Sequence, residues 1–342
     1  MSLKNLSVKI KIPKILNDHL KNKRVNQIYK KFEKNLNISE NFGVGVSGGP
    51  DSLSLAFLSK VYSIKNRIKA KFFIVDHRIR KESTVEAKLV QKILKKIFIN
   101  SKILTWKGKK PKKNIQSLAR KKRYELMYAE CDKNKMDNLL IGHHQDDLFE
   151  NFFIRMLRGS GLKGLISLDK KTKIGNKNIM RPLIDQTKDD LTYISKKVFN
   201  SYIKDPSNKD EKFQRIKIRK LITELETNGL DKKKLLSTIN NLKYSNNVVN
   251  FYVAENLRKN SFFFDKDNKL FLNRSFFLQP YEVIFRGLSK ALKLIGKKYY
   301  PVRGKKLDKI ISDIQNNHLL RVTLGGCIVE KANQTIIITK EL

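Results

Sequence analysis

The sequence predicts an α/β fold in which a twisted parallel sheet carries helices on both faces, followed by a helical linker unit and a small α+β domain. The first observation is a set of short runs rich in Val, Ile and Phe, each with the length and composition of a β-strand. These runs are FGVGV (42–46), KFFIVDH (71–77), KILTW (102–106) and NLLIGHH (138–144). The second observation is that segments of helical periodicity separate the runs. Strands and helices that alternate in this way imply right-handed crossovers and a parallel sheet.

The helical segments are expected at 52–64, 82–99, 115–131 and about 145–158. Three of the four strand runs end in polar residues with chemical capability, in the letters SGGPDS, DHR and HHQDD. Ligands of open α/β sheets bind at the carboxyl ends of the strands. The chain is therefore expected to be an enzyme whose site lies at that edge.

The pattern changes after residue 200. The segment 205–220 is polar and basic and is typical of a loop that leads into a helix, and 221–260 has helical periodicity. From about 262, short apolar runs mix with one helical stretch near 281–296. We therefore divide the chain into a catalytic domain (1–215), a helical linker unit (216–262) and a small α+β domain (263–342).

The charge points to a polyanionic partner. The 342 residues include 73 Lys and Arg against 32 Asp and Glu, which gives a formal net charge of +41. Such an excess attracts nucleic acid, although a coding sequence rich in adenine and thymine would also raise the Lys content without any partner. RNA and DNA are not distinguished at this step.

The two cysteines, Cys131 and Cys327, are too far apart in the sequence to build a disulfide framework or a Cys-x-x-Cys site. A reducing cytoplasm fits this usage. The chain contains no run of 18 apolar residues, so we expect neither export nor a membrane span.

The stretch VGVSGGPDSL (44–53) predicts an anion-binding turn. Gly48 and Gly49 permit positive φ and close approach of a ligand, and Pro50 suits the first turn of a helix. The amides at that helix N-terminus, with the hydroxyls of Ser47 and Ser52, form a cradle for phosphate.

Other interpretations of this loop fit less well. The Walker pattern requires a Lys that the loop lacks, and the formal G-x-G-x-x-G match of Gly43, Gly45 and Gly48 places its first two glycines inside the strand. An ordinary strand-to-helix turn accounts for one glycine but not for Asp51 between two serines.

In this context SGGPDS resembles the pyrophosphate-loop signature of enzymes that use ATP to adenylate a carbonyl oxygen. Further segments in the same order resemble the tRNA(Ile)-lysidine synthetase family. They are IVDHRIRKESTVEA (74–87), NIQSLARKKRYELM (114–127), IGHHQDDLFENFFIRMLRGSGLKGL (141–165), RPL (181–183), DPSNKDEKFQR (205–215) and, weakly, TLGGC (323–327). The resemblance implies a PP-loop fold of the adenine nucleotide alpha hydrolase type, in which the ATP-binding residues are Ser47, Gly48, Gly49, Pro50, Asp51 and Ser52.

The resemblance also implies the reaction. ATP adenylates the 2-carbonyl of the cytidine at the first anticodon position of tRNA(Ile) (CAU), and free L-lysine then replaces AMP to give lysidine. Mg²⁺ would neutralise the departing pyrophosphate, and Asp51 is the carboxylate best placed by sequence to assist it. Asp51 could instead be a helix N-terminal residue favoured by the dipole.

A helix beginning near 145 presents Asp147 and Glu150 on adjoining faces. By the resemblance these two carboxylates recognise lysine, and His143 lies near the adenylated base or its phosphate. Two alternatives stay open here. His143, Asp146, Asp147 and Glu150 could form a metal site, or the acidic residues could simply favour the start of a helix.

The remaining candidates contact nucleoside or phosphate. Asp76 and His77 follow the second strand, where doubly wound folds contact a nucleoside, although DHR could equally be a capping turn. The resemblance places Arg120 and Arg123 in a helix above the site and Arg215 and Arg219 in the connecting loop. Arg155 and Arg158 are candidates for phosphate contact or for helix capping. Ile216 stands where family members often carry Asn, which leaves the roles of 215–219 open.

Three rivals are weighed against this assignment. A sulfur-inserting enzyme acting on tRNA cytidine would require paired cysteines, and an ATP-dependent amide synthetase with a small substrate would not require the charge of +41. An RNA-binding protein without activity would not require the loop. We expect the C-terminal regions to bind the body of the tRNA, and we leave a homodimer open.

Overall fold

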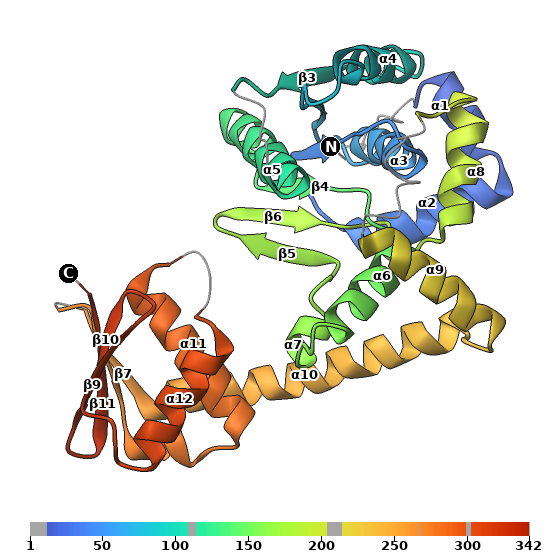
Figure 1. Cartoon of the computed structure of the whole chain (residues 1–342). Coiled ribbons are helices and arrows are strands. Elements are labelled where there is room, and N and C mark those ends of the chain that lie inside the picture. Colours follow the sequence, from blue (N-terminus) through green and yellow to red (C-terminus); the bar gives the residue numbers. More distant parts are fainter. Residues whose placement is uncertain (1–11, 109–113, 204–213, 266, 299–301, 342) are drawn as a thin grey trace, which may run out of the picture. The chain divides into compact units, whose positions relative to one another are not determined.

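The computed structural model describes residues 12–108, 114–203, 214–265, 267–298 and 302–341 (Figure 1). The predicted loop at 205–213 therefore lies outside the described residues. The chain divides into two compact units, Met1–Leu235 and Leu236–Leu342. The division into three domains stays a prediction.

The first unit is built on a sheet of order β3-β2-β1-β4-β6-β5. Its strands are β1 (Phe42–Gly45), β2 (Ala70–Asp76), β3 (Ser101–Thr105), β4 (Asn138–Leu140), β5 (Lys171–Ile174) and β6 (Lys177–Met180). All neighbouring pairs are parallel except β5 with β6, which form an antiparallel hairpin at one edge. The parallel sheet is confirmed, and the hairpin is an addition to it.

Helices occupy the connections of the first unit. They are α1 (Lys14–Leu20), α2 (Lys23–Leu36), α3 (Pro50–Lys65), α4 (Ser83–Lys95), α5 (Ile115–Lys133), α6 (Gln145–Met156), α7 (Leu162–Leu165), α8 (Lys188–Phe199) and α9 (Gln214–Thr227). The helix α10 (Lys232–Asn260) begins in this unit and continues into the second.

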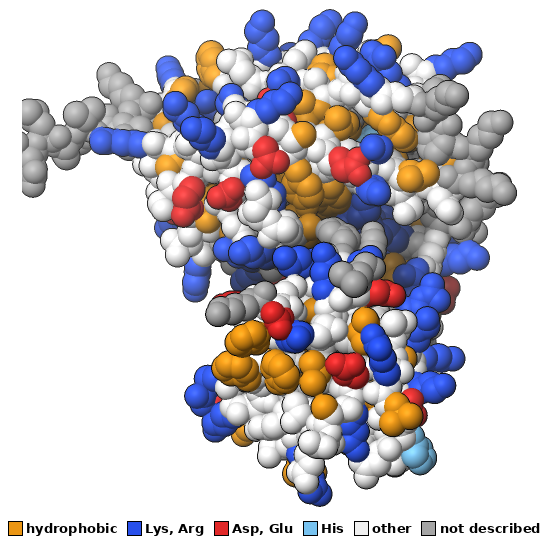
Figure 2. Space-filling model, turned by 90° about the vertical axis from the view of Figure 1, so that its left-hand side faces the viewer, with side chains coloured by type: hydrophobic (Ala, Val, Ile, Leu, Met, Phe, Trp, Pro, Cys, Tyr) orange, Lys and Arg blue, Asp and Glu red, His pale blue; other side chains and the backbone are white. Residues whose placement is uncertain are grey.

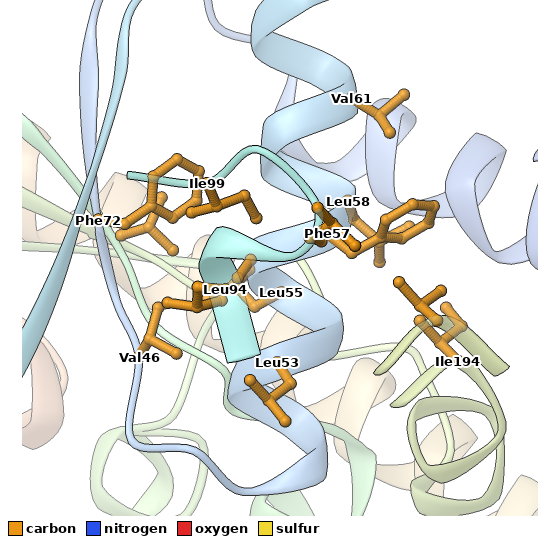
Figure 3. Close-up of a cluster of buried hydrophobic side chains, with 14 of the residues drawn as sticks. Val46, Leu53, Leu55, Phe57, Leu58, Val61, Phe72, Leu94, Ile99 and Ile194 are labelled. Carbon is orange, nitrogen blue, oxygen red and sulfur yellow. The ribbon is translucent and has the colours of Figure 1, made fainter. Parts of the chain in front are cut away.

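Alternation along the strands directs side chains to two apolar layers, one on each face of the sheet. Phe72 and Ile74 of β2 belong to a cluster with α1, α2, α3, α4 and α8, part of which Figure 3 shows around Phe57 and Leu58. Phe73, between them, belongs to a second cluster with Met127 and Cys131 of α5. Helices therefore cover both faces, as the sequence predicted.

Several boundaries differ from the expectation. The strand expected to continue to 144 ends at Leu140, and the helix expected at 82–99 ends at Lys95. Two helices before β1 were not predicted, although they bury apolar side chains such as Leu16 and Phe32 in the main core. None of the described helices is long and apolar enough to cross a membrane.

The second unit is a five-stranded antiparallel sheet of order β7-β8-β11-β10-β9 with two long helices. Its elements are β7 (Ser261–Phe264), β8 (Lys269–Leu272), the 3-10 helix η2 (Arg274–Leu278), α11 (Tyr281–Gly296), α12 (Gly304–Gln315), β9 (Arg321–Leu324), β10 (Cys327–Ala332) and β11 (Thr335–Lys340). Its core combines α11 and α12 with one face of the sheet, as in Leu292, Ile311 and Ile338. The α+β character is as predicted, whereas α12 was missed.

We predict that Gly43→Ala lowers the stability of the first unit by about 1–3 kcal/mol, because overpacking forces neighbours to move. A Cβ on Gly43 would lie 2.6 Å from the Phe73 ring and 2.9 Å from Cys131 Sγ. Gly161→Ala is the matched control, since its Cβ would meet nothing within 4 Å. Urea denaturation monitored by circular dichroism measures both, and equal stability of the two variants would contradict the tight packing of β1.

Candidate active site

A pocket of about 310 Å³ lies at the carboxyl ends of β1, β2 and β4. Eight of the residues proposed from the sequence line it: Ser47, Asp51, Ser52, His77, Arg120, Arg123, His143 and Asp147. Apolar side chains such as Phe73, Val75 and Met127 form another part of the wall. The pocket thus combines polar groups at strand ends with an apolar surface suited to a base.

The loop after β1 turns sharply into α3. Gly48 has φ of +91°, and a Cβ there would lie 2.5 Å from Val90 Cγ2. Gly49 is the N-cap of α3 with φ of −74°, so it does not use the freedom of glycine, and Pro50 begins the helix as expected. Only Gly48 is therefore required by backbone conformation.

Two loop amides converge on one point at the start of α3. The N–H groups of Ser47 and Gly48 donate to Ser52 Oγ at 3.1 and 3.0 Å, and Ser52 Oγ donates to the Gly49 carbonyl at 3.0 Å. Converging amides at a helix N-terminus suit a phosphate oxygen. In this structure the Ser52 hydroxyl accepts both amide bonds.

The segment after β4 approaches this loop closely. A Cβ on Gly142 would lie 3.3 Å from the backbone of Asp51 and from Ser52 N. Glycine here allows residues 141–147 to lie against the start of α3, so two loops distant in the sequence form one wall.

Asp51 is the carboxylate of the first loop, and Lys188 pairs with it. Lys188 Nζ lies 2.7 Å from both Asp51 oxygens, and Lys188 is the first residue of α8. His144 Nε2 is farther from Asp51 Oδ2, at 3.7 Å. Asp51 is thus held by a cation that the sequence did not reveal.

A capping box fixes the start of α6. His144 is the N-cap, and its Nδ1 accepts from the Asp146 amide while its own amide donates to Asp147 Oδ2 at 3.0 Å. Burial opposes ionisation of Asp147, but His144 and the bond from the His144 amide outweigh it and lower the pKa of Asp147 overall. Asp147 is therefore an anion at the pocket wall.

Glu150 lies one turn further along α6 and is only 2% exposed. Burial raises its pKa, against the opposing effect of Arg219, whose Nε donates to Glu150 Oε1 at 2.5 Å. Its other oxygen, Oε2, is buried without a hydrogen-bond partner among the described residues. Glu150 does not line the pocket.

Each of two pocket histidines accepts a hydrogen bond from an arginine. Arg123 Nε donates to His77 Nε2 at 3.2 Å, and Arg181 Nε donates to His143 Nδ1 at 3.1 Å. Burial and Arg123 lower the pKa of His77 to about 4, and burial is also the main cause that lowers the pKa of His143. Both rings are therefore neutral near pH 7.

Asp76 closes the turn after β2. Its side chain is 2% exposed, and it accepts from the Arg78 amide at 3.0 Å and from Thr84 Oγ1 at 2.8 Å. It does not line the pocket. These contacts fit the capping turn that the sequence analysis kept as an alternative, and the nucleoside contact of Asp76 stays a prediction.

The arginines occupy different places. Arg120 and Arg123 of α5 line the pocket, and Arg120 also donates to the Tyr124 hydroxyl. Arg215 and Arg219 lie in α9 rather than in a connecting loop, because helical structure already begins at Gln214. Arg155 and Arg158 lie near the end of α6 and do not line the pocket.

The sequence analysis missed three residues of the site: His144, Arg181 and Lys188. The letters RPL contained Arg181 but gave no indication of its contact with His143. His144 was part of HHQDD, but histidine is not a preferred N-cap residue. No local pattern signals Lys188, whose partner lies 137 residues away.

The described residues contain no group of three His, Cys, Asp or Glu side chains arranged to hold a metal ion. This does not favour the alternative of a metal site at the start of α6. A magnesium ion bound chiefly by nucleotide phosphates requires only one or two carboxylates. Asp51, whose two oxygens each lie 2.7 Å from Lys188 Nζ, stays a prediction as such a ligand.

The chain was compared with known proteins. Residues 17–226 match the model of the PP-loop domain family. A curated relative, the tRNA(Ile)-lysidine synthase of Orientia tsutsugamushi (strain Boryong), is 36% identical over 91% of this chain and 71% of its own length. The protein of that name from Wolbachia pipientis wMel is 31% identical over 87% and 70%.

Among solved structures, the U34-tRNA thiolase NcsA from Methanococcus maripaludis with its [4Fe-4S] cluster is similar in fold. It has a TM-score of 0.56 and 20% identity, over 65% of this chain and 78% of that chain. The match of the PP-loop domain to most of the first unit and the identity to curated relatives agree with the pocket geometry, and the chain belongs to the tRNA(Ile)-lysidine synthase family.

Proposed function

We propose that this chain is an ATP-dependent ligase that joins free L-lysine to the cytidine at the first anticodon position of tRNA(Ile) (CAU). The observation that carries the proposal is the pocket itself. Ser47, Asp51 and Ser52 of the loop proposed to bind phosphate line the same pocket as the carboxylate of Asp147. In the proposed reaction an amine attacks a substrate that has first been adenylated. Such a reaction requires groups that bind phosphate and a group that binds the amine substrate in one cavity.

The first step activates a poor electrophile. The cytidine O2 attacks the α-phosphorus of ATP, and pyrophosphate leaves with the electrons of the broken P–O bond. The loop amides and α3 favour the triphosphate electrostatically, and Arg120 and Arg123 add positive charge on the α5 side of the pocket. Mg²⁺, when bound, would screen the phosphate charge, and Asp51 is the residue that would hold it.

The second step requires lysine to be held by charge. The ε-amine attacks C2 of the adenylated cytidine, and AMP leaves with the electrons of the C2–O bond. Asp147 faces the pocket as an anion and suits the α-ammonium group of lysine. Glu150 is buried against Arg219 and does not line the pocket. We therefore propose that Glu150 supports the lysine subsite indirectly, by acting on Asp147 and by holding α9 through Arg219.

The tRNA would bind across a strongly basic surface. Figure 2 shows Lys and Arg side chains spread over the visible face, in keeping with the net charge of +41. Phosphate contacts supply most of the affinity for nucleic acid, so Arg155, Arg158, Arg215 and the second unit are proposed to contact tRNA. A homodimer also stays a proposal, which the mass measured by light scattering would test.

A sulfur-inserting function is disfavoured by the cysteines. Cys131 and Cys327 are both buried in separate units, and burial raises their pKa to about 12 and about 11. Buried thiols with raised pKa values are poor nucleophiles and poor cluster ligands.

The direct test of the function is incubation with ATP, Mg²⁺, radiolabelled lysine and tRNA(Ile) (CAU). We expect label on the RNA, with AMP and pyrophosphate as products in equal amounts. The same tRNA with its target cytidine changed to uridine is the control. Labelled lysine that stays free, or ADP as the product, would refute the proposal.

We predict that Asp147→Ala raises the KM for lysine about 10–100-fold, since a charge-assisted hydrogen bond contributes about 1.5–3 kcal/mol. The affinity for ATP, measured by filter binding, should change little. Asp146→Ala is the matched control, because Asp146 is the preceding residue, lies 3.6 Å from Lys232 Nζ and does not line the pocket. Equal losses of lysine use and ATP binding in Asp147→Ala would count against this division of roles.

Binding of tRNA should weaken steeply as salt rises, because each neutralised phosphate adds about −0.9 to the slope of log K against log salt concentration. Arg158→Ala should reduce the magnitude of that slope by about one if Arg158 contacts a phosphate. Fluorescence anisotropy with labelled tRNA measures the slope. An unchanged slope in Arg158→Ala would show that Arg158 does not contact a phosphate. If tRNA binding to the unaltered protein did not depend on salt, the electrostatic argument as a whole would be refuted.

A further inference from the structure

The contact between Arg181 and His143 determines which ring nitrogen carries the proton. Arg181 Nε lies 3.1 Å from His143 Nδ1. A guanidinium group has only donors, so Nδ1 must accept and cannot carry a hydrogen. In the neutral ring the hydrogen is then on Nε2, the nitrogen opposite the arginine, and His143 lines the pocket.

Arg181 is itself fixed by the edge hairpin. It follows β6 and is only 6% exposed, and its Nη1 donates to the Asp169 carbonyl and to Thr172 Oγ1, both at 2.8 Å. Its amide donates to the Lys170 carbonyl at 2.7 Å. Three bonds to residues 169–172, at and just before the start of β5, therefore hold the arginine, and the arginine contacts the ring.

The charges around His143 come from several elements. They are Arg181 after β6, Arg120 from α5, Arg215 from α9 and Asp147 from α6. The three cations and, above all, burial disfavour a proton on the ring, and only Asp147 favours one. The pKa of His143 is consequently lowered, so the ring stays neutral while Nδ1 is engaged.

We propose that Arg181 is a positioning residue that holds His143 as a fixed Nε2–H donor to the α-phosphate of the nucleotide. The proposal rests on the function proposed above and specifies one group within it. The same donor serves both steps, because negative charge is on the α-phosphate oxygens when pyrophosphate leaves and again when AMP leaves.

The same geometry excludes His143 as the base for lysine. The lone pair of Nδ1 is engaged by Arg181, and the other ring nitrogen, Nε2, already carries a hydrogen. No lone pair is left to take a proton from the attacking amine, so the proton that the amine loses passes to solvent. His143 is thus a donor in each step and an acceptor in neither.

The first experiment measures the tautomer of His143 directly and does not depend on enzymatic activity. The protein is labelled with ¹⁵N-histidine, and its five histidines give ring signals from which His143 is assigned by their loss in His143→Gln. At pH 7 we expect an unprotonated Nδ1 and a protonated Nε2. In Arg181→Met we expect a mixture of tautomers and a pKa closer to the ordinary value. A protonated Nδ1 or a cationic ring in the unaltered protein would overturn the proposal.

The second experiment compares two amides at position 143. The nitrogen of glutamine reaches the place of Nε2, whereas that of asparagine reaches the place of Nδ1, and neither amide can act as a base. We expect kcat of His143→Gln within about tenfold of the unaltered protein and that of His143→Asn lower by about 100-fold or more, as for loss of one donor to a transition state. Equal losses in the two variants would contradict a donor at Nε2.

The role of Arg181 is tested by comparing the effect of its substitution on kcat with the effect on the KM for lysine. Arg181→Met should lower kcat about 10–100-fold while the KM for lysine stays within about threefold, because the donor acts on the transition state. Thr172→Val removes one hydrogen bond to the guanidinium and should lower kcat by a smaller factor. Thr172→Ser keeps the hydroxyl and should restore kcat. These two variants test the proposal if Arg181→Met does not fold. An unchanged kcat in Arg181→Met would refute the positioning role. If the expected tautomer were observed but the unaltered protein made no lysidine, the proposed function would be refuted. The assigned tautomer of His143 would stand.

Discussion

The site depends on the parallel pairing of β1 with β2 on one side and with β4 on the other. Phe42 stands opposite Ala70 and Asn138, so three carboxyl ends lie at one edge of the sheet. The chain order reverses at β1, since β2 and β3 lie to one side and β4 and β6 to the other. Neighbouring crossovers leave opposite faces at such a point and open a crevice. The loop at 46–52 and the segment 141–147 meet there, where a Cβ on Gly142 would lie 3.3 Å from the backbone of Asp51.

The parallel core was predictable because its signal is local. A strand buried on both faces must be apolar throughout, and KFFIVDH has that character over its whole length. The ends of the strands were less predictable. The run NLLIGHH continues apolar past Leu140, but Gly142 must lie against the start of α3, which ends the pairing. The hairpin at 171–180 was missed because its strands, KTKI and KNIM, are short and rich in Lys, so they show little apolar alternation.

The site was predictable to the extent that its chemistry lies in contiguous letters. SGGPDS and HHQDD named the residues of two loops that do meet, and Asp51, His143 and Asp147 line one pocket. The residues that hold them were not accessible in this way. Lys188 and Arg181 contact Asp51 and His143 across 137 and 38 positions, and such contacts exist only after the sheet has formed. A sequence pattern can indicate a reactive group, whereas the group that orients it comes from tertiary structure.

The charges of the pocket fit the proposal that two unlike substrates share it. A triphosphate and an unpaired carboxylate would repel each other, yet the pocket carboxylate of Asp51 is paired with Lys188. Asp147 has no such cation at hydrogen-bond distance in the described residues, because its bond comes from the neutral His144 amide. Arg120 and Arg123 stand in the pocket wall on α5, and the histidines there are kept neutral. Under the proposed function, an ammonium group would be attracted to the start of α6 and phosphates to α5 and the loop. The proposed orientation of amine against phosphate would follow from this separation of charge, before either substrate touches the other.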